Sequence, residues 1–236
     1  MAEDCALTGW GHTPECWEPL AELGMPVNGV APPDLADPRP PEGAIARAAG
    51  HLPEELGILM GWSLGGLVAL EARQRCEGLV LIATPPSFLA RPRYPAGMAE
   101  ATFAEFRAGV ASDPRAALRR FYALQFQGDA APRGHWGGWR DRILDWNRSA
   151  DALLGWLDAL AGTDLTERPP ALQGPTLIVH GEADPVVDAV ATEFFAERGP
   201  DVQVRRIPGA GHAPHISHPE EVAEAIGRFV RYIAGW

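Results

Sequence analysis

The stretch "ILMGWSLGGLVALEARQ", residues 58–74, joins an apolar run to a helical pattern through a serine that stands between glycines. The run before Ser63 is typical of a buried strand, and residues 64–75 have the period of a helix. A serine is a poor choice for a core but a good one for chemistry when a tight turn presents it. Cβ atoms at Gly61 and Gly65 would collide with neighbouring backbone in such a turn, which explains the two glycines. The stretch therefore predicts a nucleophilic serine at the end of a strand.

Short apolar runs bounded by Gly and Pro alternate with helical patterns along the chain. Strands are expected at 26–30, 57–62, 78–86, 176–182 and 203–209, and helices at 64–75, 186–198 and 219–233. This alternation predicts an α/β fold with a mostly parallel, doubly wound sheet. A strand that runs into Gly-x-Ser-x-Gly and then a helix is the nucleophile elbow of α/β-hydrolases. We therefore expect the α/β-hydrolase fold, with a sheet of about six strands.

The alternation is interrupted between residues 87 and 165, where the pattern is helical and contains no strand candidate. We expect this segment to form a helical cap, inserted into a core made of residues 1–86 and 166–236. The proline-rich run at 31–41 is interpreted as a loop.

Composition narrows the class of protein. The 236 residues are 46% hydrophobic and carry a formal net charge of −11, which argues against non-specific nucleic-acid binding. No apolar run is long enough to span a bilayer, and the three cysteines lack metal-ligand spacing. We expect a cytoplasmic monomer with thiols in a reducing compartment and no metal. Residues 91–148 differ from the rest, because ten arginines and six acids give that segment a net charge of +4.

A nucleophilic serine needs a base and an orienting acid, which follow it in the order Asp/Glu, His in this fold. The strand in "TLIVHGEAD" leads to Asp184, and the strand in "QVRRIPGAG" leads to His212. Both lie just past strand ends, at the sheet edge where open α/β sheets place their sites. Asp188, inside the next helical pattern, and Glu182 remain rival acids.

The histidines near the C-terminus also have a spacing that could suggest a metal site. His212, His215 and His218 are three residues apart, but prolines interrupt any helix that would align them, and no carboxylate cluster accompanies them. We interpret His215 and His218 as loop and helix-start residues, and His180 as a satisfied core histidine.

An oxyanion hole needs two N–H donors. One should be the backbone N–H of Leu64, the residue after the nucleophile. The other should come from "LTGWGHTPECW", residues 7–17, where Gly9 permits close approach and Trp10 would supply the N–H. The Trp10 ring would also line the pocket, although plain packing explains it equally well.

Several segments together resemble a known family: "GWSLGGL", "LTGWG", "RRFYALQFQG", "HGEADPVV" and "GAGHAPHISHPEE". They are similar to the carboxylesterase family of biotin synthesis that cleaves pimeloyl-[acyl-carrier protein] methyl ester. The resemblance implies ester hydrolysis without cofactor or metal. It implies a triad of Ser63, Asp184 and His212, and oxyanion donors at Trp10 and Leu64. Of these five residues, all except Asp184 would touch the substrate. It also implies an acyl channel lined by Phe121, Tyr122, Ala123, Leu124 and Gln125.

The sequence departs from that family at its beginning. Family members start with two further strands, so we expect an N-terminally shortened sheet, and Thr8 replaces the usual histidine before Gly-Trp-Gly. The run at 31–41 also replaces a glycine-rich loop. The triad is unaffected.

The cap arginines suggest a partner. A helix starting at Pro114 would place Arg115 and Arg119 one turn apart on one face, with Arg120 beside them. They could dock an acidic acyl carrier protein, or they could simply be a solvated helix face.

Two other functions remain open. One is a general short-chain carboxylesterase, thioesterase or carbon–carbon bond hydrolase with the same triad. The other is a ligand-binding homologue that has lost turnover. Dehalogenases and epoxide hydrolases are disfavoured because they use an aspartate where this chain has Ser63.

Overall fold

The computed structural model describes residues 2–25, 27, 29–30, 41–130 and 149–235. Six parallel strands form one sheet in the order β2-β1-β3-β4-β5-β6. The strands are β1 Glu3–Leu7, β2 Gly29–Val30, β3 Leu56–Trp62, β4 Cys76–Ile82, β5 Thr176–Gly181 and β6 Val202–Ile207. The expected sheet of about six strands is confirmed.

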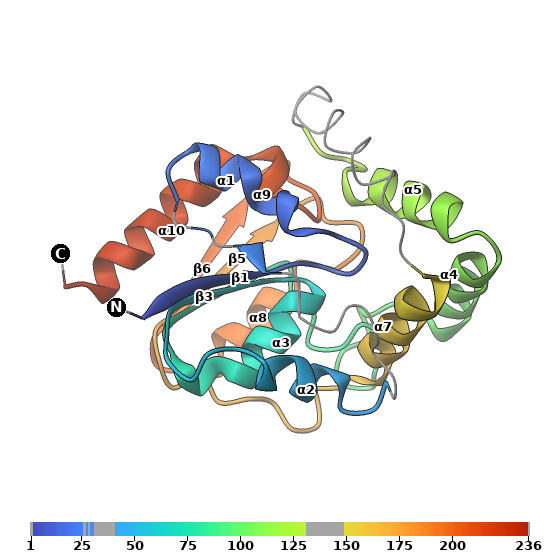
Figure 1. The fold of residues 1–236 in the computed structure, drawn as a ribbon, viewed down its shortest axis with the longest axis horizontal. Coiled ribbons are helices and arrows are strands. Elements are labelled where there is room, and N and C mark those ends of the chain that lie inside the picture. The colour runs from blue at the N-terminus through green and yellow to red at the C-terminus, as the bar shows by residue number, and fades with distance from the viewer. Residues whose placement is uncertain (1, 26, 28, 31–40, 131–148, 236) are drawn as a thin grey trace.

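Helices cover both faces of the sheet, as the doubly wound prediction requires (Figure 1). One face carries α1 Glu18–Glu22, α9 Pro214–Ser217 and α10 Pro219–Ile233. The other carries α2 Ala44–Gly50, α3 Leu64–Ala72 and α8 Ala191–Ala196. Short 3₁₀ turns, η1 Pro14–Trp17 and η2 Arg73–Arg75, complete the core. Because helices flank both faces, every residue of β3 and β5 is buried.

In the described residues between β4 and β5, three helices lie together to one side of the sheet (Figure 1). They are α4 Glu100–Ser112, α5 Pro114–Gln125 and α7 Ala150–Gly162, and they are called the cap below. The expected start of α5 is confirmed: Pro114 is its first residue, and the Asp113 carboxylate accepts the Ala116 N–H at 2.9 Å. An antiparallel bridge between Ser87 and Asp164 joins the two ends of the intervening segment.

Some elements differ from the sequence prediction. Strand β1 was not expected, because "EDCAL" is short and begins with two acids. Strand β4 ends at Ile82 rather than 86, since the following prolines cannot donate to a ladder. Helix α2 was not expected, and α8 is shorter than the predicted 186–198. Of the proline-rich run predicted to be a loop, residues 31–40 lie outside the described residues.

Candidate active site

Ser63 stands in a strained turn between β3 and α3. Its φ of 53° and ψ of −115° lie where non-glycine residues are rare. The Ser63 N–H donates to Ile82 O at the end of β4, at 2.8 Å, which holds the turn against the sheet. Strain of this kind persists only where the surrounding structure enforces it, and it is concentrated at functional sites.

The glycines beside Ser63 are required by close backbone contacts. A Cβ on Gly61 would lie 2.5 Å from Gly65 O, and a Cβ on Gly65 would lie 2.3 Å from Leu7 O. The obstructing atoms are backbone oxygens, which cannot rotate away as a side chain could. The collision expected from the sequence is therefore present at both positions.

Asp184 follows β5, and both oxygens of its buried carboxylate have polar partners. Its Oδ2 lies 2.8 Å from His212 Nδ1, and its Oδ1 accepts the N–H groups of Val186 and Val187 at 2.8 and 3.0 Å. His180 Nε2 also lies 3.3 Å from Oδ2 and 2.9 Å from Val187 O. The structure thus brings Asp184 and His212 together, as the sequence predicted.

The histidines determine the charge of Asp184. Burial by itself would raise the pKa of this carboxyl group. The charge of His212 and the hydrogen bonds from His180 and His212 outweigh burial, so the pKa of Asp184 is held well below its ordinary value. Asp184 is therefore ionised throughout the neutral range.

His212 is held through its backbone as well as its ring. Its N–H donates to Gln125 O at 2.8 Å, and its carbonyl accepts from Trp62 Nε1 at 2.9 Å. The second ring nitrogen, Nε2, is buried and has no hydrogen-bond partner among the described residues. The bond from Ser63 Oγ to Nε2 that general-base catalysis requires is not formed, and such bonds often tighten only with substrate.

The loop after β1 forms a turn beside the nucleophile. The His12 N–H donates to Gly9 O at 3.2 Å, and Gly11 takes a φ of 77° within this turn. Trp10 is buried in the turn, and its Nε1 donates to Leu153 O of the cap at 2.9 Å. Leu64 begins α3, so its N–H has no partner within the helix.

The cap segment predicted to line an acyl channel lies in α5. Phe121 packs edge-on against the Trp10 ring, with centroids 5.2 Å apart, and Tyr122 and Gln125 are also buried. Leu124 is half-buried and Ala123 is exposed, so only part of the segment faces inward.

The three arginines proposed to dock a partner are exposed on the outer side of α5: Arg115, Arg119 and Arg120. Elsewhere in the cap, Arg107 of α4 forms a bidentate pair with Asp158 of α7, at 2.6 and 2.8 Å. This pair joins two cap helices.

The rival acids lie elsewhere. Asp188 is exposed, and its Oδ1 accepts the Val190 N–H at 2.9 Å, just before α8. Glu182 is also exposed. In the described part of the chain, neither carboxylate forms a hydrogen bond with His212, which pairs with Asp184.

The other histidines form no metal site: the described residues contain no group of three His, Cys, Asp or Glu that could hold a metal. His215 is fully buried in α9 rather than in a loop, between the rings of Trp17 and Trp62. Burial, with the nearby charge of His212, lowers the pKa of His215 to about 3. His218 is the N-cap residue of α10, in agreement with the expected helix start.

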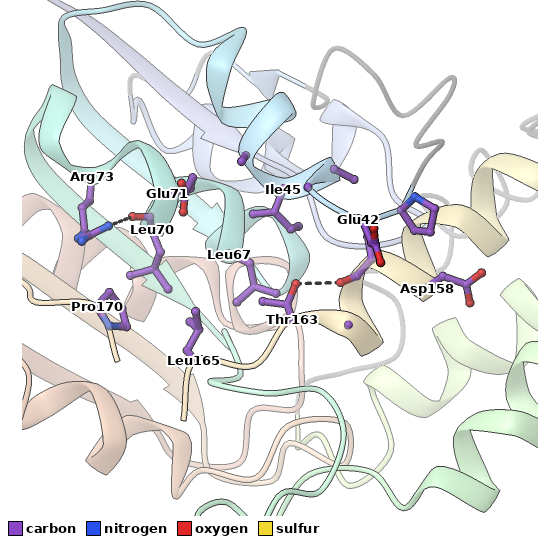
Figure 2. A pocket seen from close by; sticks show the side chains of 16 residues that line it. Glu42, Ile45, Leu67, Leu70, Glu71, Arg73, Asp158, Thr163, Leu165 and Pro170 are labelled. Atoms are coloured by element: carbon purple, nitrogen blue, oxygen red, sulfur yellow. Dashed lines mark hydrogen bonds between the residues drawn. The ribbon is translucent and has the colours of Figure 1, made fainter. Parts of the chain in front are cut away.

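A separate cavity of about 380 Å³ opens between α2, α3 and α7 (Figure 2). Ile45, Leu67, Leu70 and Leu165 form its apolar wall, and Glu71 stands at its edge. None of the triad candidates lines it, so it is not the space in front of the nucleophile.

The contacts that sequence reasoning missed are those between distant segments. His180 touches the triad carboxylate, Trp62 binds the backbone of His212, and the side-chain amide of Gln125 meets His12. The position of His180 four residues before Asp184 was visible, but a strand-end histidine is usually a packing residue. Nothing in the sequence pairs Gln125 with His12.

Comparison with known proteins identifies the family. The Alpha/beta hydrolase family matches residues 7–225. The chain is 36% identical to "Pimeloyl-[acyl-carrier protein] methyl ester esterase" of Aromatoleum aromaticum, over 95% of this chain and 96% of that protein. The protein of the same name from Stenotrophomonas maltophilia is 35% identical, over 95% of this chain and 91% of that protein.

Solved structures share the fold at lower identity. An esterase from Exiguobacterium antarcticum has a TM-score of 0.78 at 19% identity, covering 98% of this chain and 93% of that one. A bromoperoxidase from Bacillus anthracis has a TM-score of 0.74 at 23% identity, covering 98% and 92%. The strained serine, the family match and the full-length relatives lead to one conclusion: this chain belongs to the alpha/beta hydrolase family.

Proposed function

We propose that this protein is a serine carboxylesterase that hydrolyses the methyl ester of pimeloyl-[acyl-carrier protein] in biotin synthesis. The observation that carries the catalytic part is the buried 2.8 Å contact between Asp184 Oδ2 and His212 Nδ1, beside the strained turn of Ser63. The substrate is proposed from the full-length relatives, which carry that name at 32–36% identity.

The proposed reaction is acyl transfer to water in two steps. His212 Nε2 takes the proton of Ser63 Oγ while that oxygen attacks the ester carbonyl. The backbone N–H groups of Trp10 and Leu64 bind the oxyanion. His212 then gives its proton to the methoxy oxygen as the C–O bond breaks, so that methanol leaves, and a water molecule repeats the sequence on the acyl-enzyme to release the acid.

Asp184 has an electrostatic part in this scheme. Because its pKa is held low, it stays ionised and accepts a hydrogen bond from the Nδ1–H group of His212. This fixes the tautomer in which Nε2 is free to accept a proton, and it stabilises the imidazolium formed after Ser63 gives up its proton.

The acyl group would occupy the region between the nucleophile and the cap. The rings of Trp10, Phe106 and Phe121 pack against one another, with Trp10 centred 5.4 and 5.2 Å from the two phenylalanines and those two 5.7 Å apart, so aromatic side chains join the loop after β1 to the cap. We place the pimeloyl chain along the inner face of α5, with Phe121 and Leu124 as its apolar contacts.

Among the described residues, no helix has the length and apolarity needed to cross a membrane, and all three cysteines are free thiols. The proposal places the enzyme in the cytoplasm as a monomer.

The test of the catalytic assignment is Ser63→Ala. Removing the nucleophile should lower kcat for p-nitrophenyl butyrate by about 10⁴- to 10⁶-fold, with an unchanged melting temperature. Ser112→Ala, at the exposed end of α4, is the matched control and should keep wild-type activity. More than a tenth of wild-type activity in pure Ser63→Ala protein would disprove the assignment.

The substrate is tested separately. The wild-type protein should release methanol from the carrier-linked methyl ester and rescue a biotin-requiring strain that lacks its own esterase, whereas Ser63→Ala should do neither. Hydrolysis of small esters without either result would indicate a general short-chain carboxylesterase instead.

We propose further that Arg115, Arg119 and Arg120 dock the acidic carrier protein. The net charge of −11 opposes association at long range, but the Debye length of about 8 Å limits that repulsion. Near contact, the exposed arginines of α5 dominate the local field. The same helix places Phe121 inward, so a carrier bound outside would have its acyl chain close to the site.

Charge reversal tests the docking surface. Changing Arg119 and Arg120 to Glu should raise KM for the carrier-linked ester several-fold and weaken its salt dependence, while hydrolysis of a small ester stays constant. Changing Arg228 and Arg231, on α10, to Glu gives the same net charge away from the cap. Equal losses from both pairs would show that net charge, rather than a docking surface, is responsible.

A further inference from the structure

The last turn of α5 contacts the loop that would supply an oxyanion donor. The Tyr122 hydroxyl donates to Gly11 O, next to Trp10. The Gln125 amide meets His12 Nε2, with Oε1 at 3.1 Å and Nε2 at 3.0 Å, so the contact is possible for either histidine tautomer. Both side chains are about 1% exposed, and these polar contacts are therefore made away from water.

The same turn contacts the loop that carries the general base. Gln125 O accepts the His212 N–H at 2.8 Å. A Cβ on Gly211 would lie 2.3 Å from Gln125 O, and a Cβ on Gly11 would lie 2.8 Å from Leu118 Cδ2. Each loop therefore has a glycine at the point where α5 approaches it closely.

Residues just after α5 add to this attachment. The Asp129 carboxylate accepts the Gly211 N–H at 2.9 Å, and the Ala130 N–H donates to Gly209 O at 2.8 Å. The loop before His212 is thus bound at several points to α5 and to the residues that follow it.

The strands that carry the two loops are not neighbours in the sheet, although Trp62 at the end of β3 touches both loops. Its ring packs against His12, with centroids 4.3 Å apart, and its Nε1 donates to His212 O at 2.9 Å. The loop with the expected oxyanion donor, residues 8–13, follows β1 and is called the oxyanion loop; the loop with His212, residues 208–213, follows β6 and is called the base loop. Strands β3, β4 and β5 lie between β1 and β6 in the sheet. Helix α5 reaches both loops, and α5 belongs to the cap rather than to the sheet (Figure 1).

We infer that Tyr122 and Gln125 are positioning residues, which hold the oxyanion loop and the base loop at the separation that catalysis needs. This inference rests on the proposed roles of Trp10 and His212. It differs from a role in lining the acyl channel, because the polar groups of both side chains are engaged with the loops. A positioning role affects every ester alike, whereas a lining role depends on the length of the acyl chain.

The experiment compares p-nitrophenyl acetate with p-nitrophenyl octanoate. Tyr122→Phe removes one hydroxyl, and Gln125→Leu removes the amide while keeping the backbone carbonyl that binds His212. Each should lower kcat by about 10- to 100-fold on both esters, with KM within twofold of wild type, since misplaced catalytic groups act on the chemical step. The rate at which a fluorophosphonate labels Ser63 should fall in the same proportion.

Two exposed residues provide matched controls. Gln127→Leu, just after α5, and Tyr232→Phe, on α10, should keep wild-type kcat. The inference is overturned if the Tyr122 and Gln125 variants raise KM for the octanoate alone and leave acetate turnover intact, or if the controls lose as much. Should Gln125→Leu fail to fold, Tyr122→Phe alone decides the question. Retained hydrolysis by Ser63→Ala would refute the proposed nucleophile without reference to these variants.

Discussion

Replacing Asp184 with Asn isolates the electrostatic contribution of the triad from its architecture. The Asn Oδ1 can still accept the N–H groups of Val186 and Val187, so the loop after β5 keeps the bonds that shape it. The Nδ2 amide group, which can only donate, would however replace Oδ2 opposite His212 Nδ1. Two donors cannot face each other, so the His212 proton must move to Nε2.

That tautomer cannot accept the proton of Ser63. The expected loss in kcat is about 10⁴-fold, equivalent to an increase of about 5.5 kcal/mol in the activation barrier. The His180 Nε2 contact with Oδ2 would also be lost, which should lower the free energy of unfolding by about 1–3 kcal/mol.

The assay is steady-state hydrolysis of p-nitrophenyl butyrate by pure protein, with urea unfolding measured in parallel. Asp188→Asn is the matched control, because its oxygen would still accept the Val190 N–H and it is exposed. It should keep wild-type kcat. A larger loss in Asp188→Asn than in Asp184→Asn would show that the wrong carboxylate has been assigned.

Two further predictions concern stability. The pKa of His215 is lowered from 6.5 to about 3 on folding, so between these pH values the unfolded chain binds a proton at His215 and the folded protein does not. The contribution of neutral, buried His215 to the free energy of unfolding is therefore complete above pH 6.5 and is lost as pH falls toward 3. In urea unfolding, His215→Phe should reduce this acid sensitivity by up to about 1.4 kcal/mol per pH unit, and a pH profile parallel to that of the wild type would contradict the reasoning. Gly65→Ala places a methyl group 2.3 Å from Leu7 O and should destabilise the protein by at least about 1–3 kcal/mol, whereas Gly50→Ala, with nothing within 4 Å, should be neutral, so equal melting temperatures would refute the contact.

The sequence alone determined the fold class and the order of the triad candidates. A continuous apolar strand such as 57–62, followed by Gly-x-Ser-x-Gly and a helix, permits few conformations, because the constraint is local and steric. Asp184 and His212 could be chosen for a related reason. The carboxyl ends of parallel strands meet at one edge of a sheet, so residues just past two strand ends become neighbours without further information.

The short elements could not be read in the same way. Strand β1, with its two leading acids, is buried only from Cys5 onward, and its pairing with β3 is a tertiary event. Helix α8 spans Ala191–Ala196, whereas the predicted helix spanned 186–198, because apolar periodicity does not show where the turns before Ala191 end and the helix begins.

Only the tertiary structure decided how the site is held together. Gln125 O meets the His212 N–H across 87 positions of the sequence, and the Gln125 amide meets His12 across 113. No periodicity links such residues, since their contact depends on how the cap packs against the sheet. The reactive groups can be predicted from the sequence because local sterics and the ends of strands indicate them. Their mutual placement depends on packing between helices and loops that are distant in the chain.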